Sequence, residues 1–163
     1  MVYLDLALSV ESENLESLFI TQNCEWYFMV KCTQCHQDHK KDIYFTENDE
    51  VEMKGGKGVA NFGMTCPECK REGYISIHKD SAKKMDLSND RSQCVIATFD
   101  CRNLEITQWL PMVTVNVTAK ESGSLFQEID LSDLPWCDYD EKTQATVQIE
   151  VFQQEIKRNN KLK

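Results

Sequence analysis

The chain has 163 residues, 41% of them hydrophobic, which is enough for one domain with its own apolar core. Its formal net charge is −9. Such an acidic protein has no basic field to attract a phosphate backbone or an anionic lipid surface, so we expect neither nucleic acid nor membrane among its partners.

The first ten residues contain Asp5 and lack the basic segment and continuous apolar stretch of a secretory signal. No later window has the length and hydrophobicity of a transmembrane span. We therefore expect a cytoplasmic protein, and we expect it to be a monomer. In that reducing compartment its eight cysteines stay as thiols or bind metal rather than form disulfides.

Alternating apolar and polar residues predict β-strands along the chain. In chain order, the predicted strands lie within residues 4–8, 26–31, 59–65, 113–117 and 147–151. Turn-rich segments at 54–58 and 83–90 separate some of them, and no segment has a long helical stripe. This pattern predicts an all-β fold of antiparallel strands, a β-sandwich.

The sequence also contains an internal repeat. Residues 6–16 align without gaps with residues 95–105 at an offset of 89, and both segments end in Asn-Leu-Glu. This predicts one domain, 1–163, built from two related halves, 1–90 and 91–156, followed by a basic tail at 157–163 that frays.

Two CxxC pairs, Cys32 with Cys35 and Cys66 with Cys69, are separated by thirty residues. Two intervening residues let a chain form a tight knuckle that directs both sulfurs at one ion, and two knuckles complete a tetrahedron around Zn²⁺. We predict one zinc ion per chain, held by these four cysteines at one end of the N-terminal half. At the offset of 89, the segment 121–124 of the second half has no cysteine, so only the first half can hold the metal.

Other chemistry for the cysteine pairs remains open. A redox CxxC opens a helix after a strand, and no helix start follows Cys35 or Cys69. Iron also fits a tetrahedral set of four sulfurs, but rubredoxin-like knuckles usually have glycine where this chain has His36 and Lys70. We expect His36 and His39 to be exposed loop residues.

The other cysteines are Cys24, Cys94, Cys101 and Cys137, and we expect them to pack as small apolar groups.

The acidic segment near the C-terminus includes two aromatic residues. Trp136, Asp138, Tyr139 and Asp140 form a candidate surface for a protein partner, because aromatic side chains among charges are typical of binding patches. No catalytic motif is present, so we expect the protein not to be an enzyme.

Together these motifs resemble the eukaryotic CXXC-motif-containing zinc-binding proteins, over nearly the whole chain. The residues that carry the resemblance are Asn14-Leu15-Glu16, Trp26-Tyr27, Lys31, the four paired cysteines, 54–58, 99–105, Glu121-Ser122-Gly123, Trp136 and 138–142. The resemblance implies a β-sandwich of two related halves with one zinc site at Cys32, Cys35, Cys66 and Cys69. The departures are minor: Lys57 replaces a usual arginine, and Cys137 lies within the Trp136 motif.

Two functions follow as hypotheses. The first is a zinc-stabilised, non-enzymatic module that presents a surface to a protein partner of unknown identity. The alternative is a cytosolic metal-handling protein that exchanges zinc or copper through the same thiolates. The rate of metal exchange distinguishes them, because a structural site retains zinc against mild chelators and a transfer site does not.

Overall fold

The computed structural model describes residues 1–56, 58–79, 81, 84–88 and 93–162. Within this part the chain is built from β-strands and one 3₁₀ turn, η1 (Leu131–Asp133). The strands are β1 (Val2–Glu13), β2 (Leu15–Ile20), β3 (Trp26–Cys32), β4 (Ile43–Phe45), β5 (Val51–Glu52), β6 (Val59–Ala60), β7 (Phe62–Thr65), β8 (Glu72–Ile77), β9 (Met85–Asp86), β10 (Cys94–Arg102), β11 (Leu104–Leu110), β12 (Thr114–Ala119), β13 (Leu125–Asp130), β14 (Trp136–Asp140) and β15 (Ala145–Arg158).

The strand order reveals the two related halves. One sheet has the order β14-β15-β1-β10-β8-β7, and two smaller sheets have the orders β11-β3-β4 and β13-β12-β2-β9. Exchanging β1 with β10, β8 with β15 and β7 with β14 maps the large sheet onto itself. The same operation maps β11-β3-β4 onto β2-β12-β13. The expected all-β sandwich of two related halves is confirmed.

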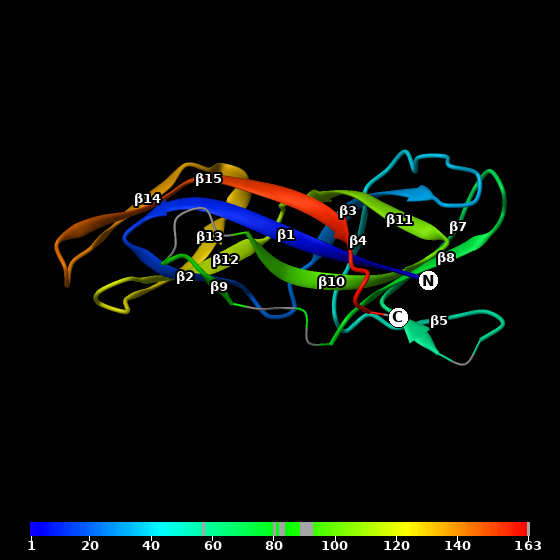
Figure 1. Cartoon of the computed structure of the whole chain (residues 1–163), viewed down its shortest axis with the longest axis horizontal. Helices are drawn as coiled ribbons and strands as arrows, with labels where there is room; N and C mark the ends of the chain where they lie inside the picture. The colour runs from blue at the N-terminus through cyan, green and yellow to red at the C-terminus, as the bar shows by residue number, and fades with distance from the viewer. Residues whose placement is uncertain (57, 80, 82–83, 89–92, 163) are drawn as a thin grey trace.

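The two halves exchange strands. β10 and β11, from the second half, pair with β8 and β3 of the first, while β1 and β2 pair with β15 and β12 of the second. In Figure 1, β3, β7, β8 and β11 lie together at one end of the molecule and β2, β12, β13 and β14 at the other. Each end of the sandwich is therefore built from both halves of the sequence.

One hydrophobic core runs through both ends. Phe99 of β10 meets Trp26 and Phe28 of β3 edge to face, with ring centroids 5.5 and 5.0 Å apart. Val115 and Ile149 are fully buried in the same cluster at the other end. The alternation read from the sequence therefore marks the inner faces of the layers.

Three expectations need correction. Met85 and Asp86, expected in a turn, form β9, because their backbone pairs with β2. The segment 59–65 is two strands, since Asn61 leaves the first pairing and its backbone N donates to Ile75 O. Lys157 and Arg158 belong to β15 rather than to a tail, because they pair with β1.

The turn predicted at residues 54–58 connects the antiparallel strands β5 and β6. Val51 and Glu52 pair with Ala60 and Val59. Lys57 within this turn, and residues 83, 89 and 90 of the expected turn at 83–90, lie outside the described residues. Within the described ranges, no helix is long and apolar enough to cross a membrane.

Candidate metal centre

Each CxxC pair follows the end of a strand and forms a tight turn. Cys32 ends β3, and its backbone N donates to Gln37 O at 3.0 Å. Cys66 follows β7, and its backbone N donates to Arg71 O at 2.8 Å. Both turns close through a left-handed residue, His36 at φ 59° and Lys70 at φ 60°.

The two turns direct four sulfurs toward one point. Cys32 Sγ lies 3.6 Å from Cys69 Sγ, and Cys35 Sγ lies 3.6 Å from Cys66 Sγ. All four sulfurs lie within 4.8 Å of one another. In a zinc tetrahedron with Zn–S bonds of about 2.3 Å, neighbouring sulfurs are about 3.8 Å apart. The four cysteines predicted from the sequence are therefore brought together at a spacing that fits zinc.

Backbone donors favour thiolates at the first cysteine of each turn. Burial raises the pKa of Cys32, but the N–H groups of Cys35 and Gln34 outweigh it and bring the pKa to about 7. The N–H groups of Cys69 and Glu68 lower the pKa of the Cys66 thiol.

Cys35 has the opposite balance. The N–H of Gln37 acts to lower its pKa, but desolvation and the neighbouring Cys66 and Cys32 sulfurs raise it to about 11. Four sulfurs this close cannot all ionise without a compensating cation. The donor set therefore fits a divalent soft metal, which holds all four as thiolates.

Two residues at the junction of β10 and β11, Asn103 and Leu104, hold the turns side by side. Leu104 pairs with Cys32 in the small sheet and packs over Gly73 of β8, where an added Cβ would lie 2.4 Å from Leu104 Cγ. Asn103 contacts the first turn and the strand after the second: its carbonyl accepts from Thr33 N at 3.2 Å, and its Nδ2 donates to Glu72 O, the first residue of β8, at 2.8 Å. These contacts were not predicted, although the repeated Asn-Leu-Glu triplet marked both positions.

Comparison with known proteins identifies the family. Residues 5–157 match the family model described as CXXC motif containing zinc binding protein, eukaryotic. The chain belongs to this family. The resemblance predicted from the sequence is thus confirmed.

Known proteins similar to the chain match it over most of its length. The CXXC motif containing zinc binding protein of Rattus norvegicus is 34% identical over 154 residues, which cover 93% of this chain and 96% of that protein. A UPF0587 protein of Drosophila melanogaster is 30% identical, covering 93% and 94%. The crystal structure of C1orf123 has a TM-score of 0.90 at 30% identity, covering 96% of this chain and 99% of that chain.

The second half of this family fold has corresponding turns without cysteines. Ala119 N donates to Ser124 O at 2.9 Å, as Cys32 N does to Gln37 O, and Gly123 takes the left-handed place of His36. Cys32 and Cys35 therefore correspond to Ala119 and Ser122, two residues earlier than the offset of 89 predicts. The connection before β12, residues 111–113, is shorter than that before β3, residues 21–25.

Asp140 takes the place of Cys66, and its carboxylate forms the centre of the second pair of turns. Thr143 Oγ1 donates to Asp140 Oδ2 at 3.0 Å, Ser124 Oγ donates to Oδ1 at 3.1 Å, and Ser122 Oγ also donates to Oδ2. The Ser122 hydroxyl is the main reason that the pKa of Asp140 lies below its ordinary value. A hydrogen-bonded carboxylate thus joins these turns where the first half has four sulfurs.

The acidic aromatic surface is smaller than expected. Asp140 is 2% exposed and cannot contact a partner, and Trp136 is half-buried against Phe126, with ring centroids 5.6 Å apart. Asp138 is exposed and Tyr139 is 52% exposed. Of the four residues, Asp138 and Tyr139 therefore face solvent, and Trp136 does so in part.

The other cysteines do not approach the cluster. Burial raises the pKa of Cys24 and of Cys101 to about 12 each, as expected for small apolar groups. Cys94 is half-buried, whereas Cys137 is exposed, contrary to expectation.

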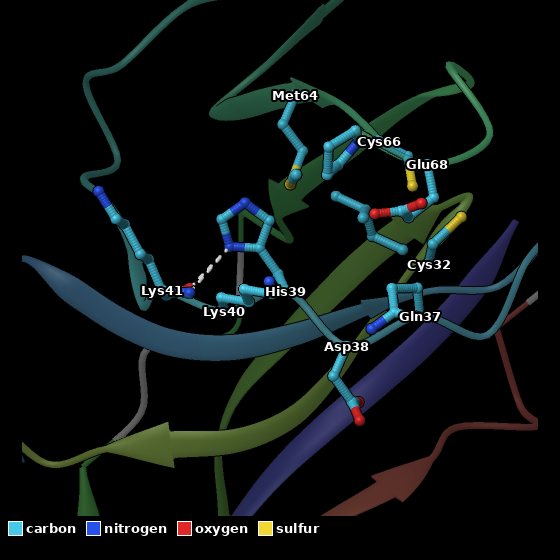
Figure 2. Close-up of a pocket in the computed structure, with 11 residues that line it drawn as sticks. Cys32, Gln37, Asp38, His39, Lys40, Lys41, Met64, Cys66 and Glu68 are labelled. Atoms are coloured by element: carbon cyan, nitrogen blue, oxygen red, sulfur yellow. Dashed lines mark hydrogen bonds between the residues drawn. The ribbon is translucent and has the colours of Figure 1, made fainter.

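A cavity of about 280 Å³ lies beside the cysteine cluster, between the segment 37–41 and the second turn, and includes Met64, Cys66 and Leu104 in its lining. Figure 2 shows His39 within this cavity, with Nδ1 directed at Lys41 O at a distance of 2.8 Å. His36 is exposed. Neither histidine belongs to the four-residue metal cluster, and both lie in the loop as predicted, but His39 is half-buried rather than exposed.

Proposed function

We propose that the chain binds one zinc ion with a structural role, through Cys32, Cys35, Cys66 and Cys69. The observation that carries the proposal is the convergence of four sulfurs at tetrahedral spacing. Membership of a zinc-binding family supports the choice of metal. The ion would fix two turns that come from different sheets.

The proposed role is non-enzymatic. Four thiolates fill all four positions of a tetrahedral zinc ion, which leaves none for a substrate or a reactive water. The exposed Asp138 and Tyr139 support a surface for a protein partner in the cytoplasm, where a monomeric chain with net charge −9 would not be drawn to nucleic acid or membrane.

Metal exchange is a second candidate. Cys35 is exposed and Cys69 is half-buried, whereas Cys32 and Cys66 are buried. An incoming thiol or chelator can therefore reach the centre from one side. This exposure favours transfer of zinc or copper more than a fully enclosed site would.

Elemental analysis of the purified full chain tests the first proposal. We expect one zinc per chain and little iron, and we expect the zinc to stay bound for hours against a mild chromophoric chelator. An iron-loaded or metal-free protein would refute the zinc assignment. Release within seconds would instead favour the exchange function.

Affinity capture from a cytosolic extract tests the surface. The wild type is compared with Tyr139→Ala and with Tyr44→Ala, a control change of an equally prominent exposed tyrosine, 59% against 52% exposed. We expect a protein that the wild type and Tyr44→Ala retain and Tyr139→Ala loses. Identical capture by all three proteins would remove the support for this surface.

A further inference from the structure

We propose that Asn103 is a positioning residue for the metal centre: it ties the two cysteine turns together and so slows loss of the metal. The inference rests on the proposed zinc function. Asn103 does not contact a sulfur. It acts by fixing the distance between the two turns that carry the sulfurs.

Asn103 contacts the first turn and the first residue of the strand that leaves the second turn. Its carbonyl accepts from Thr33 N, the residue after Cys32, and its Nδ2 donates to Glu72 O, the first residue of β8 after the second turn. Asn103 holds a left-handed conformation at φ 56°, which places its carbonyl and side chain on these two groups at once. One residue thus links two turns that belong to different sheets.

The link adds to two other contacts near the turns, the pairing of Arg102 with Tyr74 and the packing of Leu104 against Gly73. The first turn continues β3 in the small sheet, and the second joins β7 to β8 in the large sheet. A closed thiolate site releases its metal when one turn swings away and exposes a coordination position. A bridge across the turns raises the free energy of that opening.

The second half provides an internal control. Asn14 has φ 58°, its carbonyl accepts from Lys120 N at 3.0 Å, and its Nδ2 donates to Thr146 O at 2.7 Å. It therefore makes the same bridge between the corresponding turns, which have no cysteines. Both asparagines are exposed, so their hydrogen bonds are comparably solvated.

Glycine removes the amide from either residue without strain, because it adopts positive φ readily. The test compares zinc-loaded wild type, Asn103→Gly, Asn103→Asp and Asn14→Gly. The rate of zinc release to a chromophoric chelator is the main measurement, and the spectrum of the cobalt-substituted proteins reports the tetrahedral sulfur geometry. Thermal melting of each protein after metal removal reports how much each substitution lowers the stability of the fold independently of the metal.

We expect Asn103→Gly to release zinc about three to ten times faster than wild type, the factor that one lost hydrogen bond gives. Asn103→Asp should be as fast or faster, because a carboxylate oxygen then faces Glu72 O. Asn14→Gly should lower the melting temperature of the metal-free protein as much as Asn103→Gly does, yet release zinc at the wild-type rate.

Equal release rates for Asn103→Gly and wild type would overturn the inference while leaving the zinc function intact. Equal acceleration by Asn14→Gly would also overturn it, since the effect would then be general destabilisation. A wild type without zinc would instead refute the function on which the inference rests.

Discussion

Gly73→Ala tests how closely the large sheet packs against the metal centre. Gly73 lies in β8 opposite Met64, and its added methyl would meet Leu104 Cγ at 2.4 Å and both Leu104 Cδ atoms at 3.0 Å. Leu104 is only 4% exposed, and its side chain lines the cavity beside Cys32. Overpacking of this kind costs about 1–3 kcal/mol. Movement of Leu104 would also shift the first turn, so zinc release should accelerate.

A double-mutant cycle measured by urea unfolding separates this contact from a general effect. Leu104→Ala alone should cost about 2–5 kcal/mol through the cavity it leaves. The double variant should cost less than the sum, because the methyl at position 73 occupies part of that cavity. Gly56→Ala is the control, since nothing lies within 4 Å of its added Cβ. A cycle additive to within about 0.5 kcal/mol would refute the reasoning.

Two further predictions concern the two pairs of turns. Cys32→Ser and Cys66→Ser should each abolish stoichiometric zinc by elemental analysis, whereas Cys24→Ser should retain it; the reverse pattern would contradict the ligand set. The pKa of Asp140 is lowered mainly by the Ser122 hydroxyl. The stabilisation is therefore fully present at neutral pH, above the ordinary pKa of an aspartic acid, and is lost as the pH falls through the lowered pKa of the folded state. Asp140→Asn should therefore melt below wild type at pH 7, with the difference shrinking in acid; a constant difference across this range would exclude a role for the carboxylate charge.

The cysteine cluster could be predicted because its signal is local. Two intervening residues suffice to form each turn. The two CxxC spacings therefore identify the four sulfur donors without any knowledge of how the strands are arranged. The repeated Asn-Leu-Glu triplet was equally visible in the sequence, but its structural role could not be predicted from it. Asn103 and Leu104 act on turns far away in the sequence, and no local pattern shows which turns they contact.

The candidate partner surface was predicted less well. A run of acidic and aromatic residues gives no information on which side chain faces inward until the strand is paired. The register of β14 against β15 places Asp140 opposite Ala145, where the Ser122 and Ser124 hydroxyls surround its carboxylate. An acidic residue that looked like part of a surface is therefore a buried structural centre.

The sequence by itself determined the all-β class, the duplication and the four cysteines of the cluster, because each depends on residue types and their spacing along the chain. The tertiary structure decided that the halves exchange strands. β10 and β11 complete the metal-binding end, although they follow the cysteines in the second half of the chain. Pairing between strands depends on backbone hydrogen bonds that every residue except proline can make, so partner choice is set by packing of the whole core rather than by any local motif.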